Sequence, residues 1–131
     1  MREETHLEIF KERKETIFKW AIEIRGPENS QRIIGDNASR AMVELLSAYL
    51  YKKKKIKEGF QLNHRWFKSE RVSEKIPEFE GKGNIIKLMV RLENDCEMLS
   101  YGAPKPFEKV KRALGLFNQL EELIGGMYEK K

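Results

Sequence analysis

Apolar residues recur every three or four positions over four long stretches of the chain, which is the spacing of one buried helix face. These stretches cover about 6–25, 28–54, 84–100 and 107–124. A shorter amphipathic stretch, about 64–76, ends before Pro77, because the residue that precedes a proline disfavours helical backbone. The pattern predicts an all-α fold, an antiparallel up-and-down bundle of four long helices plus one short helix.

Local signals predict where the first helix begins and ends and which residues it buries. Thr5 and Glu8 have the spacing of a capping box, and Gly26-Pro27 marks the helix end. The predicted core stripe of this helix is Leu7, Phe10, Ile17, Phe18, Ala21 and Ile24. The predicted stripe of the second helix is Ile34, Ala38, Ala41, Leu45, Ala48 and Tyr49, whose small members would allow a neighbouring helix to approach closely.

Length and composition narrow the class of protein. A chain of 131 residues with 40% hydrophobic and 36% charged residues predicts one globular domain over 1–131 and excludes a disordered tail. No stretch has the length and apolarity of a membrane span, and the first residues lack the pattern of a signal peptide, so we expect a soluble, cytoplasmic protein. Abundant lysine and glutamate with few asparagines and glutamines are a bias of proteins from hot environments.

The inventory of metal-ligating residues is small. Cys96 is the only cysteine, and His6 and His64 are the only histidines, so we expect no disulfide, no metal site and no cofactor. Glu93 and Glu97 form an i, i+4 carboxylate pair, but no Glu-x-x-His motif elsewhere would complete a di-iron site.

Positive charge is concentrated between residues 52 and 75. This segment carries nine lysines and arginines against three glutamates, an excess larger than the +5 of the whole chain. The candidate nucleic-acid-binding residues are Lys52, Lys53, Lys54, Lys55, Lys57, Arg65, Trp66, Lys68 and Arg71. A solvated surface, with the lysines at the negative pole of the second helix, is the alternative interpretation.

Three features in order resemble the HEPN family, the higher eukaryote and prokaryote nucleotide-binding helical bundles. They are the helical segment 41–50, a loop that delivers Asn63 and His64, and the segment 92–102 ahead of the last helix. The likeness spans roughly residues 8–125. It implies a bundle of four or five helices, homodimerisation, and partnership with a small nucleotidyltransferase, often as a toxin and antitoxin pair.

The ribonuclease branch of that family has an arginine and a histidine that are separated by four to six residues. Arg91 occupies a plausible place for the arginine, but the corresponding histidine positions hold Cys96, Glu97 and Met98. The motif is broken, and the resemblance therefore implies a non-catalytic protein that engages a nucleotide, RNA or a nucleotidyltransferase. A divergent ribonuclease and a purely structural interaction module are the alternatives.

Several polar residues are candidates for a ligand pocket. The full set is Arg40, Glu44, Asn63, His64, Arg65, Arg91, Asp95 and Tyr101. Arg65 would bind a phosphate and Trp66 would stack a base, unless His64 only anchors the loop while Trp66 and Phe67 pack in the core. An ion pair between Arg40 and Glu44 and a buried Tyr101 are the corresponding structural interpretations.

Overall fold

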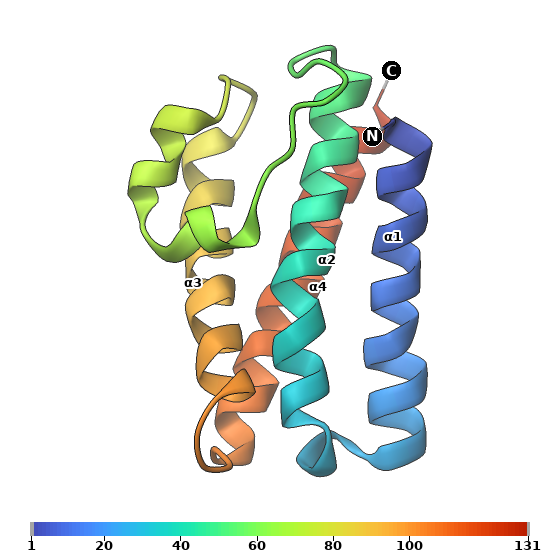
Figure 1. The fold of residues 1–131 in the computed structure, drawn as a ribbon, viewed down its shortest axis with the longest axis vertical. Coiled ribbons are helices and arrows are strands. Elements are labelled where there is room, and N and C mark those ends of the chain that lie inside the picture. Colours follow the sequence, from blue (N-terminus) through green and yellow to red (C-terminus); the bar gives the residue numbers. More distant parts are fainter. Residues whose placement is uncertain (1, 131) are drawn as a thin grey trace.

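Four long helical rods lie side by side as an antiparallel up-and-down bundle in the computed structural model, which describes residues 2–130 (Figure 1). The elements in chain order are α1 (Glu3–Glu15), η1 (Thr16–Arg25), η2 (Pro27–Asn29), α2 (Gln31–Lys52), η3 (His64–Lys68), η4 (Glu70–Lys75), α3 (Lys82–Ser100) and α4 (Phe107–Glu129). The all-α class and the four long helices are confirmed. None of the helices within residues 2–130 is both long enough and apolar enough to cross a membrane.

The first rod ends at Arg25, directly before Gly26, as predicted, but it differs from its predicted form at its start and in its hydrogen bonding. It begins at Glu3, and no side chain caps it, so the predicted capping box at Thr5 is wrong. From Thr16 the rod continues in π-helical hydrogen bonding, and the Thr16 hydroxyl donates to the Glu12 carbonyl at 2.9 Å. Wider π turns rotate later side chains relative to an α-helix. Ile17 and Ala21 accordingly stay buried, whereas Ile24, predicted to be in the core, is exposed.

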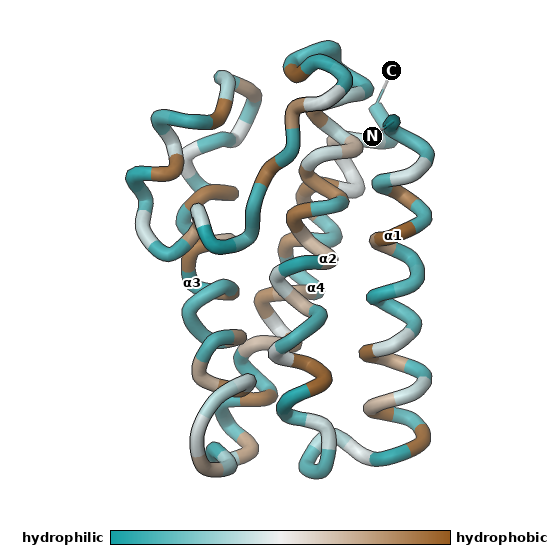
Figure 2. The backbone as a smooth tube through the Cα atoms, in the orientation of Figure 1, coloured by the Kyte–Doolittle hydropathy of each residue, from teal (hydrophilic) through white to brown (hydrophobic). Residues whose placement is uncertain are grey.

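Helix α2 is the central rod and contributes more buried apolar residues than any other element. Every residue of its predicted apolar stripe is buried, because α2 packs against α1, α3 and α4 together. Figure 2 shows the apolar and polar positions alternating along each rod. Aromatic rings close the core between the first and last rods, where Phe10 and Phe117 stack with their centroids 6.1 Å apart.

Gly35 sets the closeness of α2 and α3. A Cβ atom at this position would lie 2.6 Å from the Ser100 Oγ and 2.7 Å from the carbonyl oxygen of Cys96. Real Cβ atoms do not approach a backbone oxygen this closely, so only glycine permits the observed separation. The close approach of a neighbouring helix is therefore seen at Gly35, a residue outside the predicted stripe.

The predicted short helix is two 3₁₀ turns, η3 and η4, divided at Ser69, whose backbone is extended. Asn63 accepts a hydrogen bond from the amide of Arg65, and Ser69 accepts one from the amide of Arg71. Each turn thus has its own cap, which explains why one continuous helix does not form. Buried Phe67 and Val72 pack the turns against the bundle.

The buried ammonium of Lys82 holds the end of η4 to the start of α3. Its Nζ donates to the carbonyls of Ser73 at 2.9 Å and Ile76 at 2.6 Å, and it also contacts the carboxylate of Glu78 at 3.1 Å. These bonds satisfy a charge that burial would otherwise destabilise.

Candidate functional site

A histidine contacts a buried glutamate where η3 packs against α3. His64 is the first residue of η3, and its Nδ1 lies 3.0 Å and 3.2 Å from the two carboxylate oxygens of Glu93 on α3. The hydroxyl of Ser39 on α2 donates to the same carboxylate at 2.7 Å. Glu93 is only 4% exposed, and these partners compensate for the burial of its charge.

This contact fixes the orientation of the imidazole. Because Nδ1 faces Glu93, Nε2 is the ring nitrogen left for another partner, and the side chain of His64 is still partly exposed. A carboxylate that holds one ring nitrogen sets the tautomer and the direction of the other. The sequence pattern indicates His64 as a site candidate but not its pairing with Glu93, since 29 residues separate the two.

Three arginines from three elements line an open pocket beside His64, which we name the arginine groove. Its volume is about 390 Å³. It is lined by Arg13, Arg40, Val43, Glu44, Leu62, Asn63, His64 and Arg65. Arg13 comes from α1, Arg40 from α2 and Arg65 from η3, so only the folded bundle brings the three arginines to one pocket.

The charge of the arginine groove is strongly one-sided. Glu44 is its only acidic lining residue, and its carboxylate already contacts Nδ1 of buried His6 at 2.5 Å. None of the three arginines forms an ion pair with another residue in the range 2–130. Arg13 is nevertheless held in place, because its Nη1 donates to the side chain of Asn37 at 3.0 Å. The groove is therefore suited to an anion from outside the protein.

A second pocket, the α2–α3 pocket, adjoins the arginine groove and shares Arg40, His64 and Arg65 with it. Its volume is about 150 Å³. The other lining residues are Gly35, Asp36, Ser39, Lys68, Glu93, Cys96, Glu97, Ser100 and Tyr101. The acids here have partners: Asp36 accepts from the Ser100 hydroxyl at 2.8 Å, and Glu97 lies 3.9 Å from Lys68.

Cys96 lies against the α2–α3 pocket but is not a nucleophile. Burial raises the pKa of its thiol to about 12, and hydrogen bonding with Ser39 only partly offsets this effect. The thiolate is the reactive form of cysteine, so at neutral pH this side chain is inert.

The predicted pocket residues fall into two groups. Arg40, Glu44, Asn63, His64 and Arg65 all line the arginine groove, and Tyr101 lies in the α2–α3 pocket. Two of the structural interpretations for this group are wrong: Glu44 pairs with His6 rather than with Arg40, and Tyr101 is exposed rather than buried. The contact of His64 with Glu93 and the burial of Phe67 agree with the interpretation that His64 anchors the loop.

The second group, Arg91 and Asp95, lies between α3 and α4. Both line a different pocket together with Arg112. Asp95 is bound there by the Nε of Arg112 at 2.8 Å and by its Nη2 at 2.5 Å, a two-pronged ion pair that links the two helices.

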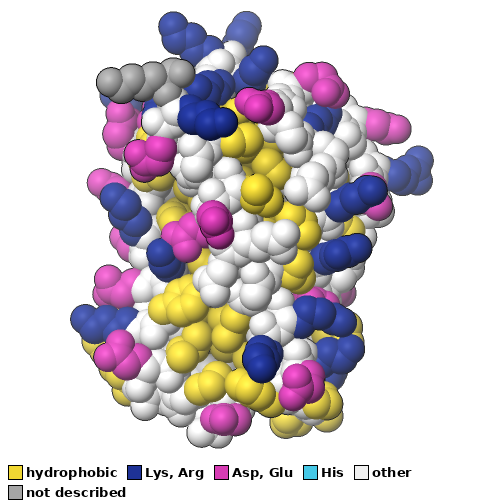
Figure 3. All heavy atoms as spheres, turned by 180° about the vertical axis from the view of Figure 1, so that it is seen from behind, with side chains coloured by type: hydrophobic (Ala, Val, Ile, Leu, Met, Phe, Trp, Pro, Cys, Tyr) yellow, Lys and Arg dark blue, Asp and Glu magenta, His cyan; other side chains and the backbone are white. Residues whose placement is uncertain are grey.

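The predicted nucleic-acid-binding residues also separate in space. Residues 52–57 lie at the end of the bundle where the chain begins and ends. Figure 3, which views the molecule from behind, shows lysine and arginine side chains gathered at that end. The Nζ of Lys52 lies 4.2 Å from the ring centroid of Tyr128, and Lys53 donates to the carbonyl of Lys130. Arg65, Trp66, Lys68 and Arg71 are instead on η3 and η4.

Trp66 is less available for stacking than its sequence context indicated. Its side chain is half-buried, the Lys75 ammonium lies 4.7 Å from its ring centroid, and Phe60 contacts it edge-on. Neighbouring Phe67 is fully buried in the core.

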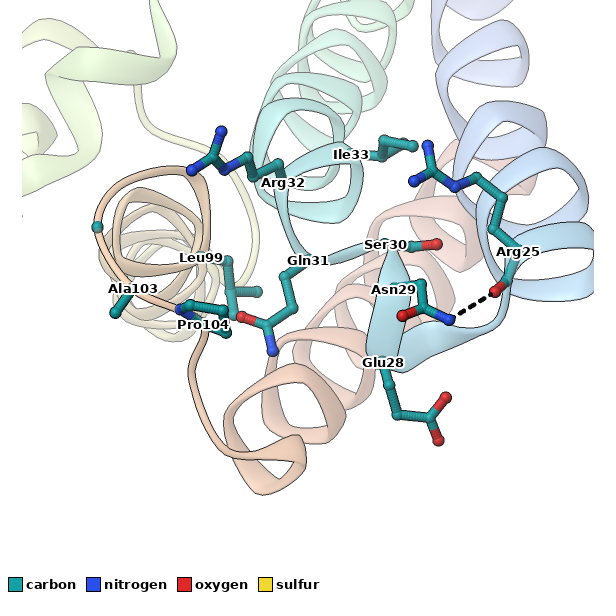
Figure 4. A pocket seen from close by; sticks show the side chains of 11 residues that line it. Arg25, Glu28, Asn29, Ser30, Gln31, Arg32, Ile33, Leu99, Ala103 and Pro104 are labelled. Atoms are coloured by element: carbon teal, nitrogen blue, oxygen red, sulfur yellow. Dashed lines mark hydrogen bonds between the residues drawn. The ribbon is translucent and has the colours of Figure 1, made fainter.

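Another pocket, of about 310 Å³, lies where η1, η2 and the α3–α4 loop meet (Figure 4). Several of its polar groups are used to join these elements. The Ser30 hydroxyl bonds to the carbonyls of Ala21 and Gly26, and Gln31 exchanges two hydrogen bonds with the backbone of Lys105. This pocket is a structural joint, and the arginine groove is the better candidate for a ligand.

Comparisons of the chain with models of known protein families, with curated proteins and with solved structures found no match. Within residues 2–130, no group of three or more histidine, cysteine, aspartate or glutamate side chains is arranged to hold a metal ion. A functional assignment therefore depends on the geometry of the arginine groove and of the His64–Glu93 pair.

Proposed function

We propose that this protein binds RNA and that the arginine groove binds the phosphates of the RNA. The observation that supports this function is the convergence of Arg13, Arg40 and Arg65 on one open pocket whose single carboxylate is engaged by His6. The HEPN resemblance, which implies a nucleotide or RNA ligand, agrees with this chemistry. The broken ribonuclease motif is compatible with this proposal, because phosphate binding does not need the histidine that the motif lacks.

Guanidinium groups suit this task for a physical reason. Each presents a planar fork of donors that matches two phosphate oxygens, and its charge persists at any physiological pH. Every phosphate that binds an arginine also releases counterions, so affinity should fall with salt at a log-log slope of about −0.7 per contact for single strands.

Fluorescence anisotropy with a labelled single-stranded RNA, measured over a salt series, tests the proposal. Arg13→Gln, Arg40→Gln and Arg65→Gln should each weaken binding and reduce the magnitude of the slope by about 0.7. Lys54→Gln and Lys55→Gln at the end of the bundle are the matched controls and should leave binding nearly unchanged. If only the lysine variants lose binding, the site lies at that end of the bundle. If the unmodified protein binds RNA at low salt more weakly than about 100 µM, RNA binding is excluded.

A divergent ribonuclease is the second candidate function, and the His64–Glu93 pair favours it. In such a reaction Nε2 of His64 would take the proton of a ribose 2′-hydroxyl while the oxygen of that hydroxyl attacks the adjacent phosphorus. The new O2′–P bond displaces the 5′-oxygen, which takes a proton from water as it leaves, and Arg40 and Arg65 would stabilise the charge on the phosphate. The imidazole that the sequence lacks after Arg91 would thus come from η3.

Incubation of RNA with the purified protein in EDTA separates the two functions. Cleavage that is lost in His64→Gln and retained in the control Arg71→Gln would establish the ribonuclease. Intact RNA, together with arginine-dependent binding, would establish the binding protein.

Assembly belongs to the same proposal, since the HEPN resemblance implies a homodimer and a nucleotidyltransferase partner. Light scattering at tens of micromolar tests the dimer directly. A monomer under these conditions would limit the proposal to RNA binding by a single copy.

A further inference from the structure

We propose that Tyr101 stacks an unpaired nucleobase, so that the α2–α3 pocket is the nucleoside subsite of the RNA site. The ligand class is then single-stranded RNA rather than a duplex. This inference rests on the proposed function and adds the part of the ligand that phosphate contacts do not recognise.

The exposure of Tyr101 is the first observation. It caps the C-terminus of α3 with extended backbone, and its side chain is 68% exposed. Within residues 2–130 its hydroxyl makes no hydrogen bond and its ring makes no aromatic contact. One turn earlier, Met98 is also 41% exposed, so a ring and a thioether are together left in water at this helix end.

The position of Tyr101 is the second observation. It lines the α2–α3 pocket together with Arg40, Arg65 and Lys68, and the first two of these also line the arginine groove. On its other side it lines a shallow cleft with Asn94, Glu97, Met98 and Lys105. A strand whose phosphate is bound by the shared arginines therefore has an exposed aromatic ring in the next pocket, where its base would lie.

The chemistry of this subsite favours a base without a pairing partner. In a duplex both faces of each base are already stacked on their neighbours, whereas an unpaired base has a face available for an aromatic side chain. Stacking is tolerant of sequence, because every base has a π face. The phenol hydroxyl is not required for stacking, and a phenyl ring should serve equally well.

Anisotropy measurements with three labelled probes test this inference on the full chain. The probes are a single-stranded RNA, a ribose-phosphate strand of equal length without bases, and a duplex RNA. Tyr101→Ala should weaken binding of the single-stranded RNA roughly five- to 150-fold, the range of one lost base stack, at an unchanged salt slope. Tyr101→Phe should bind like the unmodified protein.

Two controls make the result specific. Phe107→Ala removes another exposed aromatic ring, 42% exposed, that lies outside both pockets, and it should not change binding. Arg40→Gln should weaken the strand without bases as well as the RNA, whereas Tyr101→Ala should weaken only the RNA.

The possible failures are distinguishable. Equal affinity of the unmodified protein for the strands with and without bases, or an unchanged affinity of Tyr101→Ala for RNA, would overturn the base subsite while leaving phosphate binding intact. Preference for the duplex would overturn it as well. Absence of binding to every probe would overturn the proposed function itself.

Discussion

Nδ1 of His64 lies 3.0 Å from the carboxylate of Glu93, and this contact ties a five-residue 3₁₀ turn to the core of the bundle. Short 3₁₀ turns have little stability of their own. Glu93 is buried and also accepts from Ser39, so the contact joins η3, α3 and α2 at one point. The adjoining Arg65 is thereby placed at the arginine groove.

Glu93→Gln should destabilise the protein by about 1.5–3 kcal/mol, because it replaces charge-assisted hydrogen bonds by neutral ones. Urea denaturation followed by circular dichroism measures the change in free energy of unfolding. Glu97→Gln, an exposed glutamate one turn further along α3, is the control and should change stability by less than about 0.5 kcal/mol. Equal effects of the two variants would mean that the buried contact does not stabilise η3.

Gly35→Ala should destabilise the protein by about 1–3 kcal/mol, because the added Cβ would meet the Cys96 carbonyl oxygen at 2.7 Å and force α2 and α3 apart. Gly115→Ala on α4 is the matched control, since a Cβ there would have no neighbour within 4 Å. That control should stabilise the helix by up to about 1 kcal/mol. Opposite shifts in Tm for the two alanines are the expected result, and two increases would contradict the close helix approach.

Cys96 should resist alkylation in the folded protein. Burial raises the pKa of its thiol to about 12, so at pH 8 only about one thiol in ten thousand is ionised, and the reagent must also reach a buried atom. Iodoacetamide treatment followed by mass spectrometry should show an unmodified native chain and a fully modified chain in urea. Rapid modification of the native chain at pH 8 would show that the α2–α3 pocket opens to the thiol.

Lys82→Met should destabilise the link between η4 and α3 by about 1–3 kcal/mol, because the carbonyls of Ser73 and Ile76 lose their donor. Hydrogen exchange should increase first in the amides of η4. Lys87→Met, at an exposed position of the same helix, is the control and should leave the exchange of η4 unchanged. Uniform changes in both variants would mean that the buried ammonium does not hold this turn.

Helix formation could be predicted from the sequence because its signals are local. The stripe from Ile34 to Tyr49 repeats at the period of the α-helix, and all of its predicted members are buried. The errors occurred where a side chain competes with the regular backbone pattern. Ser69 caps its own turn and divides the predicted short helix, and widened π turns after Thr16 rotate Ile24 into solvent.

By itself, then, the sequence determined the all-α class, the four long helices and the central stripe of α2, because these depend on residues within a few positions of one another. Only the tertiary structure decided that His64 meets Glu93, that Arg13, Arg40 and Arg65 share a groove, and that Arg91 and Asp95 lie elsewhere. Such contacts depend on how far each helix is rotated about its axis and shifted along its neighbour. That geometry is set by packing across the bundle, as at Gly35, and it cannot be predicted from the spacing of residues within one helix.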